Sequence, residues 1–311
     1  MKQPARGIRA VRKVTPSDPG PVSGNELLGF PLDRRQLTAQ VKHALTEDGA
    51  FNDITTIATV LSDRRARAAL VARSPGVIAG VPFALTAFRQ LDSKVVIRVD
   101  ADDGARATAG SSVMFISGHA RAMLSAERVA LNYLQRLSGI ASLTAQYVDA
   151  VRGTRARILD TRKTTPGMRA LEKYAVRAGG GMNHRLDLSE AILIKDNHLA
   201  SVGGDVALAV QRARKLAPEG TRIEIECDSE KQVQAALDSG ADIVLLDNMS
   251  VQQLERCVAM AAGRALTEAS GGISLQTVRD IAESGVDWIS IGALTHSAPA
   301  LDLALDFESL A

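Results

Sequence analysis

The chain has 311 residues, of which 46% are hydrophobic, and a formal net charge of +2. This length fits one large domain or two of ordinary size, and the composition is sufficient for a sizeable buried core. No apolar run approaches the roughly 18 residues of a membrane span, so we expect no membrane association. The two cysteines, Cys227 and Cys257, have neither metal-motif spacing nor the density of a disulfide framework, which favours reduced structural thiols in a cytosolic protein.

Residues 1–24 differ in character from the rest of the chain. Five basic residues and one acidic residue, Asp18, lie there among four prolines, with no apolar stretch of the kind found in a secretory signal. We expect a disordered basic tail rather than an organellar transit peptide, because serine is scarce and no amphipathic pattern is present. The remaining chain has a net charge of −2, so a nucleic-acid-binding function has no support outside this tail.

The first part of the chain after the tail mixes helix and short strands. Residues 33–46 have a helical pattern, and β-rich runs follow at 68–72, 95–99 and 113–116. Glycine and aspartate separate these runs, as is typical of turns. The pattern predicts an α+β domain with short strands.

Apolar residues then recur at helical spacing from 127 to 151, and beyond this helix strands alternate with helices. Thr165 and Pro166 predict the N-cap and first position of a helix that ends at the glycines 179–181. The alternation predicts a parallel sheet, most simply closed as a barrel. We expect its strands at 158–161, 191–194, 223–227, 243–246, 265–268 and 288–291.

Polar residues or glycines follow almost every expected strand, where barrel enzymes form their active sites. Glycine turns after the last two strands favour phosphate binding through bare backbone N–H groups. His184 and Arg185 come directly after the glycine run and suit a carboxylate ligand. These strand-end residues are Arg162, Lys163, Lys195, Glu226, Asp247, Ser270, Gly271, Gly272, Gly292 and Ala293.

Two features of this set have more than one interpretation. Glu224, Glu226 and Asp228 share one face of the third strand, which points into the barrel or, if the strand lies at an edge, into solvent. Lys195 either forms a Schiff base, as in a barrel lyase, or is one of several cations that hold a substrate. The other cations around it favour the second interpretation.

Eight segments of the chain are distinctive: NDITT (52–56), ERVALNYLQRLSGIAS (127–142), DTRKTTPGMRALEKYAVRAGGGMNHR (160–185), LIKDNH (193–198), IEIECDS (223–229), LLDN (245–248), EASGGI (268–273) and ISIGALTHS (289–297). In these segments, and over nearly its whole length after the tail, the chain resembles the quinolinate phosphoribosyltransferase family. Only Asn52, Asp187 and Glu190 depart from the family pattern, which usually has glycine, glycine and aspartate there.

The resemblance implies transfer of phosphoribosyl from phosphoribosyl pyrophosphate to quinolinate with decarboxylation, which gives nicotinate mononucleotide, pyrophosphate and carbon dioxide in NAD biosynthesis. Magnesium is the implied cofactor. Glu226 and Asp247 are implied to lie near the ion and the ribose of the donor, and to hold the ion indirectly through the donor and water molecules. Lys163, Glu226 and Asp247 are the implied catalytic residues. The implied substrate-binding set also contains Arg128, Thr161, Arg162, His184, Arg185, Lys195, Ser270, Gly271, Gly272, Ile291, Gly292 and Ala293.

The implied fold is that of a type II phosphoribosyltransferase: an α/β sandwich at 25–128, joined by the segment 298–311, and an incomplete α/β barrel of six or seven parallel strands at 129–297. Arg128 resembles an arginine that reaches the partner subunit's site, which implies a homodimer with shared sites or a higher oligomer. The expected location is the cytoplasm. The alternative within the family is a divergent homologue associated with molybdenum transport that uses another acceptor.

Overall fold

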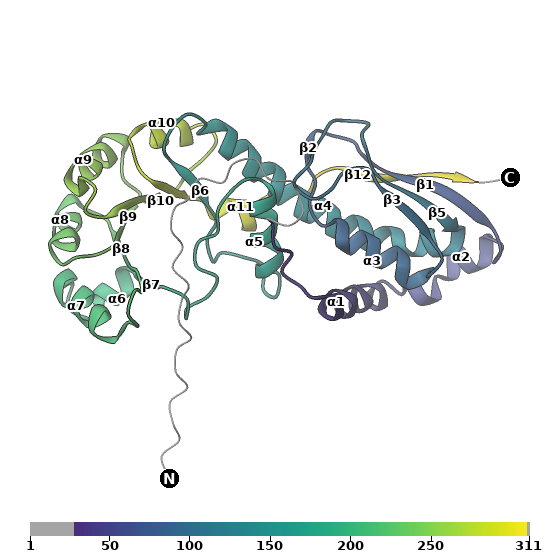
Figure 1. Ribbon diagram of the computed structural model, residues 1–311, viewed down its shortest axis with the longest axis horizontal. Coiled ribbons are helices and arrows are strands. Elements are labelled where there is room, and N and C mark those ends of the chain that lie inside the picture. Colours follow the sequence, from purple (N-terminus) through teal and green to yellow (C-terminus); the bar gives the residue numbers. More distant parts are fainter. Residues whose placement is uncertain (1–27, 310–311) are drawn as a thin grey trace, which may run out of the picture. The chain divides into compact units, whose positions relative to one another are not determined.

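The computed structural model describes residues 28–309, so the expected tail at 1–24 lies outside the described residues. The described chain divides into two compact units (Figure 1). Unit 1 contains Tyr147–Lys163 and Met182–Gly292, and unit 2 contains residues 28–146, Thr164–Gly181 and 293–309. The boundary expected between residues 128 and 129 falls inside a continuous helix, α4 (Ala120–Ala150).

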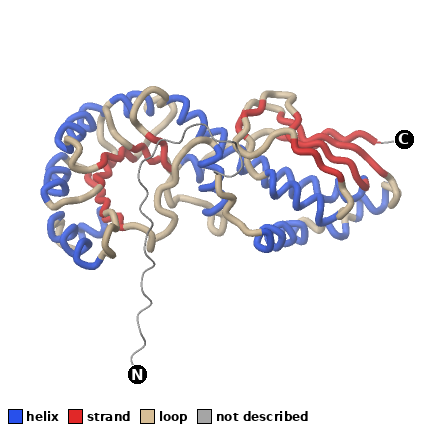
Figure 2. Tube along the Cα trace, in the orientation of Figure 1, coloured by secondary structure: helices blue, strands red, loops and turns tan. Residues whose placement is uncertain are grey.

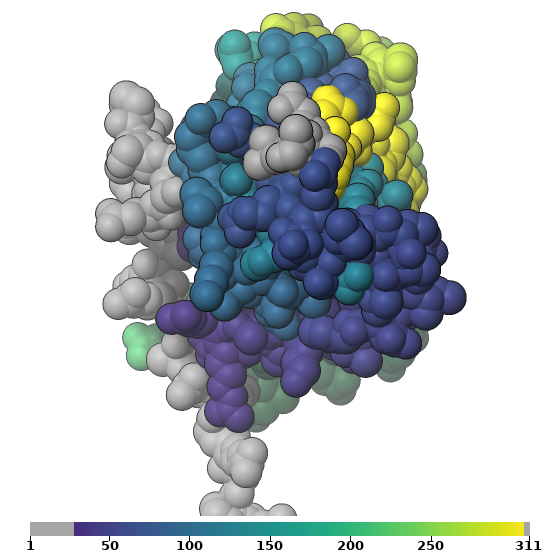
Figure 3. All heavy atoms as spheres, turned by 90° about the vertical axis from the view of Figure 1, so that its right-hand side faces the viewer, coloured from purple at the N-terminus to yellow at the C-terminus, as the bar shows by residue number. Residues whose placement is uncertain are grey.

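Unit 2 is built on a four-stranded antiparallel sheet in the order β12-β1-β5-β3. The last strand of the chain pairs with the first, with Leu70 opposite Leu305, so the carboxyl-terminal segment completes the amino-terminal sheet. Figure 3 shows β12 in yellow beside the blue atoms of this unit. The strands are β1 (Arg65–Ala72), β3 (Val96–Val99), β5 (Ser112–His119) and β12 (Leu303–Ser309), and a separate pair joins β2 (Gly76–Val77) to β4 (Arg106–Ala107).

The helices of unit 2 include the three expected from the sequence, although α4 begins at Ala120 rather than near 127 and η1, α2, α3 and α11 were not predicted. Asp33 caps the first helix through a capping box with Gln36, as the pattern at 33–46 predicts. Gly139 in α4 is packed so closely that a Cβ there would lie 2.0 Å from the Pro299 carbonyl oxygen. The helices are α1 (Arg34–Glu47), η1 (Ala50–Asn52), α2 (Ile54–Thr59), α3 (Val81–Leu91), α4, α5 (Arg169–Ala178) and α11 (Ala293–His296).

The expected start of α5 at Thr165 and Pro166 is wrong. The helix begins at Arg169, because residues 166–168 form a turn in which Gly167 has φ +77°, outside the helical region. The Thr165 N–H and hydroxyl instead donate hydrogen bonds to the Glu172 carboxylate, at 3.0 and 2.9 Å. Thr165 is therefore held by a side chain of the helix rather than acting as its cap.

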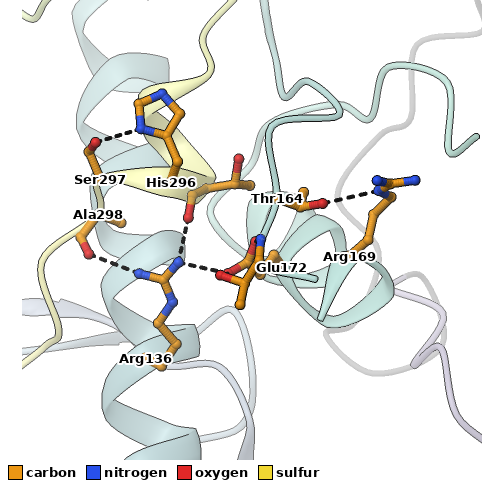
Figure 4. Close-up of polar contacts among 9 residues, drawn as sticks. Arg136, Thr164, Arg169, Glu172, His296, Ser297 and Ala298 are labelled. Carbon is orange, nitrogen blue, oxygen red and sulfur yellow. Dashed lines mark hydrogen bonds and ion pairs between the residues drawn. The ribbon is translucent and has the colours of Figure 1, made fainter. Parts of the chain in front are cut away.

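Glu172 is fully buried and is the centre of a polar network in unit 2 (Figure 4). Arg136 of α4 donates to Glu172 at 2.7 Å and also to the Ala298 and Thr295 carbonyl oxygens. The network thus joins α4, α5 and the chain after α11 through one guanidinium group. Since Thr164 and Thr165 follow the expected site residues Arg162 and Lys163 in the chain, the network also fixes the end of that loop.

Unit 1 contains six parallel strands in the order β6-β11-β10-β9-β8-β7, as the alternation predicts. The two end strands do not pair with each other, so the barrel is incomplete, and Met182 adds a parallel bridge to Leu159. The strands are β6 (Arg157–Leu159), β7 (Ile192–Ile194), β8 (Ile223–Cys227), β9 (Ile243–Asp247), β10 (Leu266–Ser270) and β11 (Trp288–Ser290).

Helices cover the outer face of this curved sheet, with the strands inside (Figure 2). Cys227 and Cys257 are buried in this unit and form no disulfide. Within residues 28–309, no helix combines the length and apolar composition that crossing a membrane requires. The outer helices are α6 (Asp196–Ala200), α7 (Val206–Leu216), α8 (Glu230–Asp238), α9 (Val251–Ala261) and α10 (Val278–Glu283).

Candidate active site

The strands of unit 1 run parallel, so the residues at their carboxyl-terminal ends lie at one end of the barrel. Lys195, after β7, and Glu226, on β8, meet there in an ion pair with Nζ and Oε2 2.9 Å apart. The Lys195 side chain is 47% exposed. A Schiff-base lysine is commonly activated by removal from water, whereas this lysine is half exposed and paired with a carboxylate. The pair therefore favours the interpretation of Lys195 as a substrate-holding cation.

The acidic residues of β8 point into the barrel rather than into solvent at a sheet edge. β8 lies between β7 and β9, so it is an interior strand. Glu224 is 4% exposed, Glu226 is partly buried, and Asp228, beyond the strand, is exposed. The structure thus excludes the edge-strand interpretation and places two carboxylates inside the barrel, where they need cations or hydrogen-bond donors.

Asp247 and the glycine turn after β10 are joined by Asn248, a residue that the sequence analysis did not select. The Asn248 side chain donates to the Asp247 carboxylate at 2.7 Å, and its backbone N–H donates to the Ser270 carbonyl oxygen at 2.9 Å. A Cβ on Gly271 would lie 2.3 Å from the Asn248 side-chain oxygen, and Gly271 has φ +93°. Only glycine fits this position, where the β9 and β10 loops meet.

Arg162 and Arg185 form the cationic part of the site. Both side chains are partly buried, and the Nε atom of each is buried without a hydrogen-bond partner in the described chain. Arg185 donates one hydrogen bond, from Nη1 to the Ala191 carbonyl oxygen at 2.9 Å. Burial, followed by the like charge of Arg162, lowers the pKa of Arg185. Two crowded guanidinium groups with unused donors are suited to a ligand that has more than one negative charge.

Asp160 holds the segment that contains His184 and Arg185 beside β6. It is fully buried and accepts hydrogen bonds from the Asn183 side chain at 2.6 Å and from the His184 N–H at 2.9 Å. The sequence analysis selected neither Asp160 nor Asn183. Asp160 could have been found from its position directly after an apolar strand, because an unpaired carboxylate in such a place is costly and a partner must lie nearby.

The two ring nitrogens of His184 both face protein groups. Nδ1 accepts a hydrogen bond from the Arg185 N–H at 2.8 Å, while Nε2 lies 3.0 Å from Glu224 and 3.6 Å from Glu268. His184 was expected to contact a substrate carboxylate directly. In the structure its ring lies between the backbone at Arg185 and carboxyl groups of the barrel interior, and its contact with substrate stays a prediction.

The other expected residues divide between the units. In unit 1, the Lys163 N–H donates to Thr161 Oγ1 at 3.0 Å, and the buried Ile291 N–H donates to the Leu159 carbonyl oxygen at 2.9 Å. Ser270, Gly271, Gly272 and Gly292 also belong to unit 1. Arg128, exposed on α4, and Ala293, the first residue of α11, belong to unit 2.

Asp187, one of the departures from the family pattern, stabilises the turn that contains it. Its carboxylate accepts hydrogen bonds from the Ser189 N–H at 2.8 Å and from the Ser189 hydroxyl at 2.6 Å. These bonds lower the pKa of Asp187 below its usual value. An aspartate that bonds the backbone two residues ahead is a common turn former, so its presence here is compatible with the loop.

Two cavities in unit 1 lie at the amino-terminal ends of strands, away from Lys195, Glu226 and Asp247. One, of about 430 Å³, is lined by Asp242, Asp287 and the start of β10. The other, of about 260 Å³, is mostly apolar and extends from Trp288 and Thr221 to Arg185. The first cavity therefore lacks the strand-end position that parallel α/β barrels use for catalysis, whereas the second reaches the candidate site at His184 and Arg185.

Comparison with known proteins agrees with this architecture. Residues 53–138 match the family model for the quinolinate phosphoribosyl transferase N-terminal domain, and residues 140–306 match that for its C-terminal domain. A nicotinate-nucleotide pyrophosphorylase [carboxylating] from Mycobacterium leprae is 46% identical over 274 residues, which cover 86% of this chain and 95% of that protein. A probable one from Bacillus subtilis is 39% identical, with 88% and 94% covered.

Solved structures give the same result. The crystal structure of NadC from Streptococcus pyogenes superposes with a TM-score of 0.85 at 42% identity and covers 90% of this chain and 99% of that one. The nicotinate-nucleotide pyrophosphorylase from Francisella tularensis superposes with a TM-score of 0.83 at 37% identity, with 89% and 98% covered. The expected fold class is confirmed, and the chain belongs to the quinolinate phosphoribosyltransferase family.

Proposed function

We propose that this protein transfers the phosphoribosyl group of phosphoribosyl pyrophosphate to quinolinate, with decarboxylation, to give nicotinate mononucleotide, pyrophosphate and carbon dioxide in NAD biosynthesis. The relatives' shared name, nicotinate-nucleotide pyrophosphorylase, supports the reaction. The observation in the molecule that carries the proposal is the pair Arg162 and Arg185, whose buried Nε donors have no hydrogen-bond partner within residues 28–309. Quinolinate, a rigid dicarboxylate, is a ligand that such a pair is suited to bind.

Electrostatics explain why the site needs several cations. Quinolinate has two negative charges and the donor has several more, so the two substrates repel each other in one site. Arg162, Arg185 and Lys195 hold the quinolinate carboxylates in the proposal, and Lys163 lies between the substrates. Fixed cations of this kind also stabilise the charge that develops on the leaving pyrophosphate.

The donor occupies the other side of the site in the proposal. Its 5′-phosphate binds the backbone N–H groups at Ser270, Gly271, Gly272, Gly292 and Ala293, with Thr161 and Ile291 nearby, because glycine turns after the last strands leave such donors uncovered. Glu226 and Asp247 face the ribose. As the bond from C1 of the ribose to pyrophosphate breaks, positive charge develops on the ribose, and these two carboxylates stabilise it.

Decarboxylation follows from the transfer itself. The pyridine nitrogen of quinolinate attacks C1 of the ribose, and the ring becomes a pyridinium. Loss of the adjacent carboxylate as carbon dioxide leaves an electron pair on the ring carbon next to the positive nitrogen, which stabilises it. A proton then adds to that carbon. The residues of the site bind and orient the reactants, and the electron sink is the ring of the substrate.

Magnesium fits the donor side of the site. Glu226 and Asp247 end the neighbouring strands β8 and β9, and carboxylate oxygens are the protein ligands that Mg²⁺ prefers. Bound with the donor, the ion would neutralise pyrophosphate oxygens and keep several waters, with these two residues acting on it through donor and water. Asn248 and Lys195, which contact the two carboxylates, would orient them.

We further propose a cytoplasmic homodimer in which Arg128 of one subunit completes the site of the other. The exposure of Arg128 on α4 supports this assignment. The alternative, a divergent homologue associated with molybdenum transport, has no support among the named relatives, all of which have the pyrophosphorylase or NadC name.

A coupled assay tests the reaction. Purified protein is incubated with quinolinate, phosphoribosyl pyrophosphate and magnesium, and nicotinate mononucleotide and carbon dioxide are measured together. We expect equal amounts of the two products, and no product when any one component is omitted. Donor binding without turnover would point to a different acceptor and contradict the proposal. Borohydride trapping with a carbonyl substrate should leave Lys195 unmodified, whereas a trapped adduct on Lys195 would restore the lyase interpretation.

A further inference from the structure

A layer of polar side chains lies inside the barrel beneath the candidate active site. Side chains of a strand alternate between faces, so residues two apart point the same way. Three strands have a polar residue two positions before a residue of the site, and two of these residues are carboxylic acids. They are Glu224 before Glu226, Glu268 before Ser270, and Ser290 before Gly292.

This layer is dry. Glu268 is fully buried, Glu224 and Ser290 are each 4% exposed, and the proposed mechanism uses none of them. Neither oxygen of Glu268 has a partner at normal hydrogen-bond distance in the described chain, and Glu224 Oε1 also has none. Two carboxyl groups in such surroundings are costly, so the layer needs a physical explanation.

His184 is the group that meets both acids. Its Nε2 atom lies 3.0 Å from Glu224 Oε2 and 3.6 Å from Glu268 Oε2. A histidine and two carboxylates also form the donor set of a transition-metal site. A metal-bound imidazole, however, donates its other N–H to an acceptor. Here the other nitrogen, Nδ1, faces the Arg185 N–H, which is itself a donor. The ring must therefore keep its proton on Nε2, which leaves no lone pair there for a metal.

The Nε2–H of His184 is then one donor facing two carboxyl groups, Glu224 and Glu268. Two buried carboxylates cannot both be satisfied by one donor, so one of the two carboxyl groups has to hold a proton. Glu224 is nearer to Nε2 and is the acceptor. Glu268 is the carboxyl that remains protonated: burial raises its pKa to about 8, the charge of Glu224 adds to the effect, and His184 and Ser290 oppose it. Carboxyl oxygens of Glu268 and Glu224 lie within 4.8 Å of each other, so Glu224 is the carboxylate within reach of a proton held by Glu268.

We propose that Glu268 and Glu224 are positioning residues that act through His184 on Arg185. The relay runs from the Glu268 O–H to the Glu224 carboxylate, from His184 Nε2–H to the same carboxylate, and from the Arg185 N–H to His184 Nδ1. It fixes the backbone at Arg185, and hence the guanidinium beside Arg162. The inference rests on the proposed function in one respect, which is that Arg185 binds a quinolinate carboxylate.

Two variants of Glu268 separate positioning from simple packing. Glu268→Ala removes the hydrogen-bond donor, and we expect the KM for quinolinate to rise about ten- to a hundredfold, as for a misplaced binding group, with the donor KM changed less than about twofold. Glu268→Gln keeps the shape and an N–H donor, so it should retain a quinolinate KM within about threefold of the parent. Leu245→Val is the control, because Leu245 pairs with Glu268 on the adjacent strand but takes no part in the relay.

The relay is contradicted if Glu268→Ala raises both KM values equally, if Glu268→Gln behaves like Glu268→Ala, or if Leu245→Val raises the quinolinate KM as much as Glu268→Ala. Nitrogen-15 NMR of labelled histidine gives a second readout that requires no activity. We expect His184 in the Nε2–H tautomer at pH 7, and an Nδ1–H signal or a retained stoichiometric metal ion would overturn the inference. If the parent protein does not turn over quinolinate, the proposed function fails, and the NMR result still decides the relay.

Discussion

Arg136 and Glu172 form an ion pair in unit 2, with 2.7 Å between Arg136 Nη2 and a carboxylate that has no exposed surface. Removal of Arg136 leaves that charge buried without its guanidinium partner, while the two Thr165 hydrogen bonds remain. We expect Arg136→Met to destabilise the protein by about 3–5 kcal/mol, measured as a lower midpoint of denaturant unfolding. Arg152→Ala, which breaks an exposed pair with Asp149, should cost less than about 1 kcal/mol.

Glu268 should make stability depend on pH with a defined sign. Its folded pKa of about 8 is above the usual value of 4.5, so the folded state holds a proton that the unfolded state releases between these two values. The contribution of Glu268 to stability is therefore present below about pH 4.5 and is lost as pH rises to about 8. Glu268→Gln does not titrate, so it should be more stable than the parent at pH 8, by on the order of 2–4 kcal/mol, and similar at pH 4.5. Parallel melting curves of the two proteins across this range would contradict the assignment.

Gly271→Ala should damage the donor side of the site. The new Cβ would meet the Asn248 side chain at 2.3 Å and would require a strained backbone at φ +93°. We expect the KM for phosphoribosyl pyrophosphate to rise at least about tenfold, because Asn248 orients Asp247. Gly153→Ala is the matched control, since Gly153 has a similar φ of +86° in open space, and it should leave this KM unchanged.

Arg185→Ala should weaken quinolinate binding with little effect on the donor. The guanidinium and Arg162 together match two carboxylates, and a charge-assisted hydrogen bond of this kind contributes about 1.5–3 kcal/mol. Calorimetry should therefore show a Kd for quinolinate raised roughly ten- to a hundredfold. Unchanged quinolinate affinity would remove Arg185 from the proposed carboxylate site.

Mixing of two inactive variants tests the shared site. If Arg128 acts in the partner's site, both substitutions fall in the same site of a dimer that pairs an Arg128→Ala subunit with a Lys163→Ala subunit. The other site of that dimer is then complete. Activity should then rise to about a quarter of the parent value after random subunit exchange, since half of the dimers are mixed and each has one of two sites. Exchange has to be verified with differently tagged subunits. No recovery after verified exchange would contradict the shared-site proposal.

The sequence predicted those parts of the fold in which local signals agree with the final packing. Period-two alternation with apolar flanks located β8 at its observed bounds, Ile223–Cys227, and Asp33 marked the start of α1. Thr165 and Pro166 failed as a helix start because Gly167 adopts a positive φ that residue patterns do not reveal. Asp160 and Asn183 were missed for another reason, since their pairing depends on a contact between segments that are distant in the sequence.

The candidate site shows the same division. Strand-end positions predicted which cations and acids gather at one end of the barrel, and the Lys195–Glu226 pair agrees with that expectation. The direction of the His184 ring was not predictable, because it depends on Glu224 and Glu268 from two other strands. The position of a residue at the end of a strand indicates where its Cα atom lies. The orientation of its side chain depends on neighbours from other strands, which the sequence does not identify.

The pairing of β12 with β1 has a consequence for biosynthesis. Leu305 is made more than two hundred residues after Leu70, and the two become neighbours in one sheet. Until residues 303–309 leave the ribosome, β1 lacks one of its two partners and presents an unpaired edge to other chains. The nascent protein therefore depends on the late synthesis of β12 to cover this edge, and a chain released before residue 303 would have a permanent surface for aggregation.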